Sequence, residues 1–276
     1  MTESLRSRLS AGAMAAGAAM KRWGVRILAG LAAGLLGSAG ALACEGDKCA
    51  NGLAYEAFGA APGGSRPVLA IFVHGDVSAG GPADYMYAYA RQFASGRKNV
   101  VAVALLRPGY YDRTGHRSDG SDNGRRDTFH SGNNRAVAGA ISELRQRYNA
   151  RSVVALGHSG GAGTIGVVAG NNPGLINGLV LVSCPCDVPA WNASRGRRPG
   201  SAQSPVDYVS GIPGGTPIVA VTGHADDNTR PELATDYVAK AQARGLPAKA
   251  QIVGGGHGFS GALSATSVSA LGAMAR

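Results

Sequence analysis

The sequence predicts a mixed α/β fold in which a mostly parallel sheet carries helices on both faces. The chain of 276 residues is 45% hydrophobic and 16% charged, a composition that can bury a core. From Pro67 onward, continuous apolar runs alternate with runs of amphipathic character. Repeated strand–helix units indicate a parallel sheet, and continuous apolar runs are typical of strands buried on both faces.

The expected elements follow in a regular order. The strands are uncharged or nearly so and are expected over 67–75, 99–110, 152–161, 176–184, 216–223 and 247–255. The helices have apolar residues at helical spacing and are expected over 83–94, 133–148, 162–170, 231–245 and 261–275. The fourth of these helices is marked at both ends, because Pro231 opens it and Gly245 closes it. Ligands bind beyond the carboxyl ends of such strands, so functional residues are expected at those ends.

The first 43 residues differ from the rest of the chain. Residues 20–26 are basic, 27–36 are uncharged and mostly apolar, and 37–43 are small and end in Ala-Leu-Ala. This order predicts a secretory signal peptide over 1–43, with Met20 as an alternative true start. The apolar run is shorter than the roughly 20 residues that a membrane helix needs. We therefore expect an exported protein, periplasmic or secreted, without a membrane span.

Cysteine usage agrees with export. Cys44 follows the signal directly, so either ordinary cleavage after Ala43 or lipid attachment to Cys44 is open; the absence of leucine three places earlier favours ordinary cleavage. An even number of cysteines in an oxidising compartment predicts disulfides. Cys44 and Cys49 can close a short loop, and Cys184 and Cys186 form a CxC pair. The paired CxxC spacing of a zinc site is absent, so no metal is expected.

The formal net charge is +10. The densest basic stretches are 195–198 and Arg125-Arg126, and neither is interleaved with aromatic residues or part of a nucleic-acid-binding motif. We expect a solvated basic surface and no nucleic-acid partner. No phosphate-binding or cofactor motif is present, so no cofactor is expected, and the oligomeric state stays unknown.

The segment "VVALGHSGGAG" at 153–163 concentrates glycine where an apolar strand ends. Residues 157–161 fit G-x-S-x-G at a strand-to-helix junction, which is the pattern of a nucleophile elbow. The tight turn forces the serine into strained backbone angles, and the flanking glycines leave room for it. The following helix directs free N–H groups at the serine. Ser159 is therefore the candidate nucleophile, against the alternative of a glycine-rich turn with an inert serine.

A serine nucleophile needs a base, and the base needs an acid to orient it. Asp226 lies in the loop after the strand at 216–223, and His257 lies between glycines after the last strand. Asp227 is adjacent and remains a rival acid. A turn histidine and a loop-capping aspartate are the structural alternatives for these positions.

Four motifs at successive strand ends carry a resemblance: "VHGD" at 73–76, "GHSGG" at 157–161, "GHADDNTRP" at 223–231 and "GGGHGF" at 254–259. From about Leu53 to the C-terminus the chain resembles the α/β-hydrolase family. The resemblance implies an α/β-hydrolase fold and hydrolysis through an acyl-enzyme. It makes Ser159 the nucleophile, His257 the base and then the acid, and Asp226 the acid partner.

The same resemblance implies an oxyanion hole made by the backbone N–H groups of Gly160 and Asp76, with Val77 as the fallback donor. An aspartate is unusual there, because its carboxylate would repel a developing oxyanion. We therefore expect its side chain to point away or to bind another group.

Three domain segments are expected: the signal peptide at 1–43, an N-terminal segment at 44–66 and the hydrolase domain at 67–276. The loop 107–130 either lines the substrate site or is a mobile surface loop. The resemblance implies that residues at about 185–215 occupy the place where the family inserts a lid, and a lid of this small size favours small or exposed substrates. The leading interpretation is an exported carboxylic-ester hydrolase acting on a small-molecule ester. The alternatives are a serine peptidase similar to the prolyl oligopeptidase catalytic domain and a non-catalytic binding protein of this fold.

Overall fold

The sheet at the centre of the structure is mostly parallel. The computed structural model describes residues 44–198 and 201–276. Within them, eight strands lie in the order β1-β2-β4-β3-β5-β6-β7-β8. Their bounds are β1 Cys49–Ala50, β2 Leu53–Phe58, β3 Val68–Val73, β4 Val100–Leu105, β5 Ser152–His158, β6 Gly178–Val182, β7 Ile218–Gly223 and β8 Ala248–Val253. Neighbours from β4 to β8 pair in parallel, whereas β2 pairs antiparallel with both β4 and β1.

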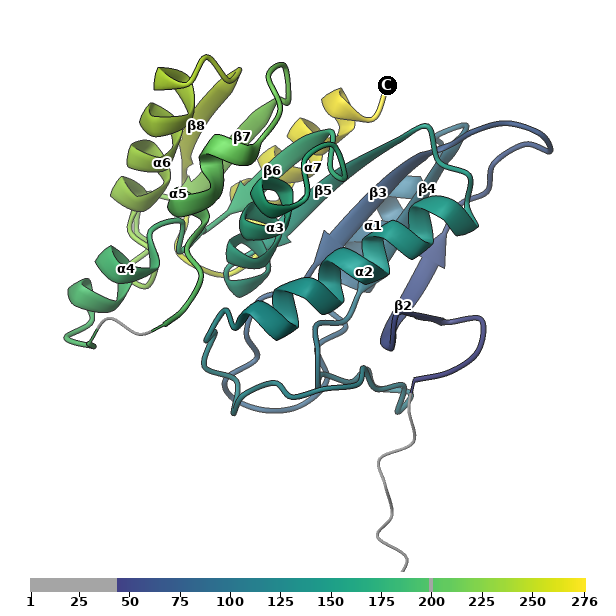
Figure 1. Cartoon of the computed structure of the whole chain (residues 1–276), viewed down its shortest axis with the longest axis horizontal. Coiled ribbons are helices and arrows are strands. Elements are labelled where there is room, and N and C mark those ends of the chain that lie inside the picture. The colour runs from purple at the N-terminus through teal and green to yellow at the C-terminus, as the bar shows by residue number, and fades with distance from the viewer. Residues whose placement is uncertain (1–43, 199–200) are drawn as a thin grey trace, which may run out of the picture. The chain divides into compact units, whose positions relative to one another are not determined.

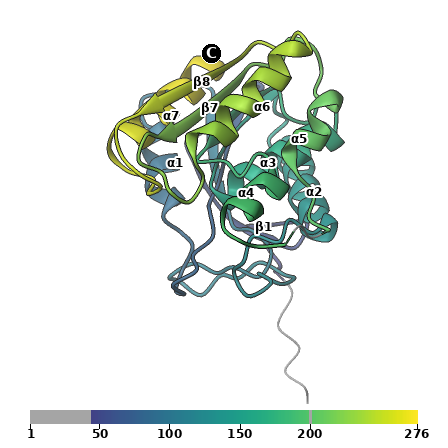
Figure 2. The same cartoon turned by 90° about the vertical axis from the view of Figure 1, so that its left-hand side faces the viewer.

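Helices cover both faces of the sheet (Figures 1 and 2). The helix bounds are α1 Met86–Ala94, α2 Ser131–Arg147, α3 Gly160–Asn171, α4 Val188–Ser194, α5 Pro205–Tyr208, α6 Pro231–Ala243 and α7 Gly261–Met274. Helices α2, α3 and α6 pack on one face, and α1 and α7 pack on the other. The pleat of β3 divides its side chains between the two, with Leu69 and Ile71 in one core and Ala70 and Phe72 in the other. This arrangement confirms the predicted fold class.

The predicted elements agree with the structure in kind and order. All six predicted strands occur within their expected ranges. Five of them are almost fully buried and are marked by continuous apolar sequence, whereas β8 lies at the edge of the sheet and is only partly buried. Helices α2 and α3 begin earlier than predicted, at Ser131 and Gly160. The N-terminal segment forms two strands that the sequence analysis did not predict. Of these, β2 adds an antiparallel strand to the sheet by pairing with β4.

Helix α3 is rich in glycine and yet is buried along nearly its full length. The glycines allow neighbouring backbone to approach the helix closely. A Cβ at Gly166 would lie 2.9 Å from the Pro205 ring, and a Cβ at Gly170 would collide with the backbone of Tyr208. The low helix propensity of glycine is therefore offset here by tight packing of α3 against α5.

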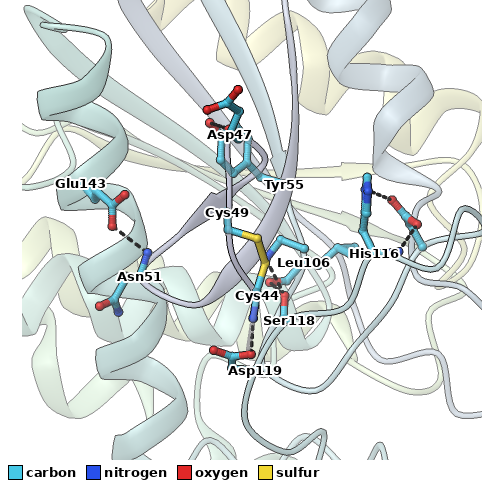
Figure 3. Close-up of a disulfide and its surroundings, with 12 residues drawn as sticks. Cys44, Asp47, Cys49, Asn51, Tyr55, Leu106, His116, Ser118, Asp119 and Glu143 are labelled. Carbon is cyan, nitrogen blue, oxygen red and sulfur yellow. Dashed lines mark hydrogen bonds and ion pairs between the residues drawn. A yellow bond between two sulfur atoms is a disulfide. The ribbon is translucent and has the colours of Figure 1, made fainter. Parts of the chain in front are cut away.

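Two disulfides are present, Cys44–Cys49 and Cys184–Cys186, and no described cysteine is free. This confirms the disulfide prediction. Figure 3 shows the first disulfide where the described chain begins. The backbone N–H of Cys44 donates to Asp119 Oδ1 at 2.7 Å, and the backbone N–H of Asn51 donates to the Glu143 carboxylate at 2.7 Å. These contacts attach the N-terminal segment to the loop 107–130 and to α2.

The predicted signal peptide at 1–43 lies outside the described residues, and so does the predicted cleavage after Ala43. In the ranges 44–198 and 201–276, no helix combines the length and the apolarity that crossing a membrane requires.

Candidate active site

Ser159 occupies a strained turn between β5 and α3. Its backbone angles are φ 53° and ψ −122°, a left-handed conformation that is rare for a residue with a side chain. The turn is held on both sides. The Ser159 N–H donates to the Val182 carbonyl on β6 at 2.8 Å, and the Ser159 carbonyl accepts from the Ala162 N–H at 2.9 Å. The serine therefore stands at the carboxyl end of the central strands with its strain supported by regular structure.

Glycines let three backbone segments meet around this serine. A Cβ at Gly157 would collide with the carbonyl group of Gly161, and a Cβ at Gly161 would collide with the carbonyl of Val73 at the end of β3. A Cβ at Gly75 would lie 2.9 Å from the Ser159 Cβ. The glycines of the elbow are thus required by close approach, as the sequence predicts.

The structure brings the three predicted residues together. Ser159 Oγ lies 2.9 Å from His257 Nε2, and His257 Nδ1 lies 3.0 Å from Asp226 Oδ2. Asp226 follows β7 and His257 follows β8, so the carboxyl ends of neighbouring strands supply both groups. Asp227 is exposed and makes no hydrogen bond to another described residue. Asp226 is therefore the carboxylate that contacts the histidine.

The Asp226 carboxylate is buried and fully hydrogen-bonded. Its Oδ1 accepts from the backbone N–H groups of Asn228 at 3.1 Å and Thr229 at 2.8 Å, and its Oδ2 accepts from the Thr229 hydroxyl at 2.8 Å. Burial raises the pKa of Asp226, but the hydrogen bond and the charge of His257, together with the hydrogen bond from the Thr229 backbone N–H, outweigh burial and hold the pKa below its usual value. The carboxylate is therefore ionised at neutral pH.

Asn228 and Thr229, which follow Asp226 closely in the sequence, also contact His257. No role was predicted for either residue. Thr229 Oγ1 lies 3.1 Å from His257 Nδ1, and Asn228 Nδ2 lies 3.1 Å from His257 Nε2. The Asn228 carbonyl accepts from Trp191 Nε1 at 2.9 Å, which links α4 to the acid loop. The signal was present, because an aspartate often accepts hydrogen bonds from the backbone just after it and fixes those residues in a turn.

The two predicted oxyanion donors are free. The N–H groups of Gly160 and Asp76 have no hydrogen-bond partner within the described residues, and neither has the N–H of Val77. The Asp76 side chain is bound by Tyr110, whose hydroxyl donates to its carboxyl group. The expectation that this side chain binds another group is thus met by a residue of the loop 107–130.

A buried ion pair, Asp127 with Arg107, lies beside Ser159. Asp127 packs so closely on Gly160 that a Cβ there would collide with its carboxylate, and it pairs with Arg107 at 2.7 Å. Burial and then the charge of Asp127 raise the pKa of Asp76 to about 6, against the lowering effect of Tyr110. Sequence reasoning missed Asp127 and Arg107, for which the only signal was their place in a long loop after a strand end.

The loop 107–130 lies at the site, which favours the first of its two interpretations. Arg125 Nη1 donates to the carbonyls of Val77 and Gly81, both at 2.9 Å, and so fixes the loop that carries Asp76. Its side chain is only 13% exposed, so the prediction of a solvated basic surface is wrong for Arg125. The prediction holds for Arg126 and for the arginines of 195–198, which are exposed.

Metal ligands are not grouped in the part of the chain that the structure describes. There, no cluster of three or more His, Cys, Asp or Glu side chains is placed to hold a metal ion.

Comparison with solved structures shows what this architecture is. Est1E from Butyrivibrio proteoclasticus with bound ferulic acid superposes with a TM-score of 0.59 at 14% identity, over 82% of this chain and 96% of its own. Esterase PE8 superposes with a TM-score of 0.54 at 14% identity, over 79% of this chain and 96% of its own. The chain has the α/β-hydrolase fold. No protein-family model and no curated protein sequence matches it.

This α/β-hydrolase fold also occurs as one part of larger enzymes. The acylaminoacyl peptidase of Pyrococcus horikoshii superposes with a TM-score of 0.58 at 15% identity, over 81% of this chain but only 38% of the peptidase. The chain therefore spans less than half the length of that peptidase and nearly the full length of the two esterases.

Proposed function

We propose that this chain is an exported serine hydrolase that cleaves a carboxylic ester of a small molecule through an acyl-enzyme. One observation carries the proposal: Ser159 Oγ, the His257 imidazole and the Asp226 carboxylate form a continuous hydrogen-bonded chain, with contacts of 2.9 and 3.0 Å. Ser-His-Asp chains of this geometry catalyse acyl transfer on several unrelated folds.

The roles follow from the protonation states. Ionised Asp226 accepts the Nδ1–H of His257, which leaves the lone pair of Nε2 directed at Ser159. When Oγ attacks the ester carbonyl, its proton moves to Nε2, and the imidazolium then gives this proton to the departing alkoxide. Water repeats the sequence to release the acid and regenerate the serine.

The negative charge on the tetrahedral intermediate needs donors that are already in place. The N–H groups of Gly160 and Asp76 fill this role in the proposal, and the N-terminal end of α3 adds its dipole behind Gly160. The Asp76 carboxyl stays bound to Tyr110, which keeps its charge from facing the oxyanion directly.

The length of the matched structures and the small size of the 185–215 segment favour an ester substrate over a peptide. This chain matches the two esterases over nearly their full length, whereas it matches only 38% of the peptidase. In the described part of the 185–215 segment, the helices α4 and α5 and the 3₁₀ turn Val209–Gly211 are all short, which supports a small or exposed substrate. A peptidase and a non-catalytic binding protein are the competing outcomes of the test.

Labelling with a fluorophosphonate probe, followed by rate measurements, tests the proposal. We expect the wild-type protein to be labelled, the Ser159→Ala variant to remain unlabelled, and p-nitrophenyl esters to be hydrolysed faster than peptide p-nitroanilides. Faster cleavage of the anilides would favour the peptidase. Absence of labelling and of turnover with every ester and anilide would contradict the proposal and favour a binding protein.

Export is part of the proposal and rests on separate support. Both disulfides fit an oxidising compartment, where such bonds form and persist.

A further inference from the structure

His158, which precedes the nucleophile, belongs to a hydrogen-bond chain that ends on the catalytic histidine. His158 Nε2 lies 2.8 Å from the His257 carbonyl, and His158 Nδ1 lies 2.7 Å from the Tyr85 hydroxyl. The same hydroxyl accepts from the Gly75 N–H at 2.6 Å. The chain therefore joins the loop before Asp76 to the loop that carries the base.

Only one arrangement of protons satisfies every member. The Gly75 N–H can only donate, so the Tyr85 oxygen accepts there. The His257 carbonyl can only accept, so Nε2 of His158 must carry a proton. In a neutral imidazole Nδ1 is then an acceptor, and the Tyr85 hydroxyl donates to it. Burial lowers the pKa of His158 to about 4, which keeps the ring neutral under ordinary conditions.

The loop around His257 needs such an anchor. It reads Gly254-Gly255-Gly256-His257-Gly258, so its neighbours contribute no side chains that could hold the backbone. Among the described residues, His158 alone donates a hydrogen bond to the His257 carbonyl. Glycine loses more conformational freedom on ordering than any other residue, so an unanchored loop would spread the position of the imidazole.

Helix α1 supports the same loop from a second point. Tyr85 stands immediately before α1 and Tyr89 lies one turn further on, at a spacing that places both on one side of the helix. The Tyr89 hydroxyl donates to the Phe259 carbonyl at 2.8 Å, and the two rings pack edge to face with centroids 4.7 Å apart. The base loop is thus held at the His257 and Phe259 carbonyls, in addition to the Gly255 carbonyl, which accepts from the Ala225 N–H at 3.0 Å.

We propose that His158 and Tyr85 are positioning residues that hold His257 and the oxyanion loop in register across Ser159. The inference rests on the proposed function, because it assigns these residues to the same reaction. In this proposal both residues act through the backbone of the loops that they hold. They fix the base on one side of the nucleophile and the Asp76 N–H donor on the other, so both act on the geometry of one transition state.

Two substitutions at His158 separate its two bonds. Glutamine reaches about as far as Nε2 and can keep the donor to the His257 carbonyl, whereas asparagine reaches only to about Nδ1 and keeps the contact with Tyr85. We expect His158→Asn to lower kcat about 10- to 100-fold with little change in KM. His158→Gln should recover most of that loss, and Tyr85→Phe should lower kcat while retaining the fold.

The outcomes distinguish this inference from the proposed function. Wild-type kcat in His158→Asn, or equal losses in the glutamine and asparagine variants, would overturn the positioning role while Ser159→Ala still reports the triad. A readout without substrate is ¹⁵N NMR of the imidazole rings. We expect neutral His158 with its proton on Nε2, and a proton on Nδ1 instead would overturn the inference whether or not the protein turns over esters.

Discussion

The structure determines how the side-chain amide would be oriented in an Asp226→Asn variant. Two backbone N–H groups, of Asn228 and Thr229, donate to Oδ1, so the amide oxygen of the variant must occupy that place. The amide NH₂ then takes the place of Oδ2, which lies 3.0 Å from His257 Nδ1. Because the NH₂ can only donate, Nδ1 must become the acceptor and the ring proton must move to Nε2.

The expected loss of kcat follows from that tautomer of His257. With a proton on Nε2, His257 has no lone pair to accept the proton of Ser159, and the carboxylate that stabilises the imidazolium is gone. Loss of this function in a Ser-His-Asp site lowers kcat by about 10³- to 10⁴-fold, which corresponds to about 4 to 5 kcal/mol of transition-state free energy. Oδ1 keeps both of its backbone N–H donors, from Asn228 and Thr229, in the variant, so we expect the fold to survive.

The assay is kcat/KM on a p-nitrophenyl ester, with ¹⁵N NMR to report the tautomer of His257. Asp227→Asn is the matched control, because Asp227 is the exposed neighbour and should leave the rate unchanged. An Asp226→Asn enzyme with wild-type turnover, or an inactive Asp227→Asn enzyme, would refute the assignment of the acid.

Three further predictions concern other parts of the chain. Gly160→Ala should lower turnover and reduce stability by about 1–3 kcal/mol, because the methyl group meets a packed carboxylate, whereas Gly132→Ala, in open space in the first turn of α2, should leave turnover unchanged and should not reduce stability. His74 and His158 are buried, with pKa values of about 3 and about 4 against 6.5 when unfolded. The unfolded state therefore binds more protons below pH 6.5, and each residue should cost about 2 kcal/mol of stability between pH 7 and pH 5 in urea titrations; His158→Gln should flatten this slope. Mass spectrometry of the exported protein should find Cys44 at the N-terminus, and an intact leader in the envelope fraction would contradict this.

The sequence predicts the parallel sheet well because β3, β4, β5, β6 and β7 are almost fully buried and appear as uninterrupted apolar runs. Ser159 follows β5 directly, Asp226 lies three residues after β7, and His257 lies four residues after β8, an edge strand of mixed burial. Ser159 and His257 also stand among glycines, which mark close backbone turns. The apolar strand pattern therefore predicted the fold, and the positions of these residues after strands predicted the central contacts of the site.

Other features had no comparable signal. Strand β2 is antiparallel, contains Glu56, and its burial falls along its length, so it lacks the continuous apolar pattern of the central strands. Asp127 and Arg107 lie in a long polar loop whose path over α3 depends on side-chain contacts. The roles of Tyr85 and His158 depend on partners distant in sequence, and no local period or motif encodes such contacts.

The sulfur of Cys44 can hold one covalent partner besides its own carbon. In the structure that partner is Cys49. A lipid anchor would occupy the same sulfur as a thioether and would leave Cys49 with a free thiol. Membrane attachment and closure of the N-terminal loop are therefore mutually exclusive fates of one atom. A preparation can be sorted between them by counting alkylatable thiols on the unfolded, unreduced protein: none for the disulfide form and one for the lipidated form.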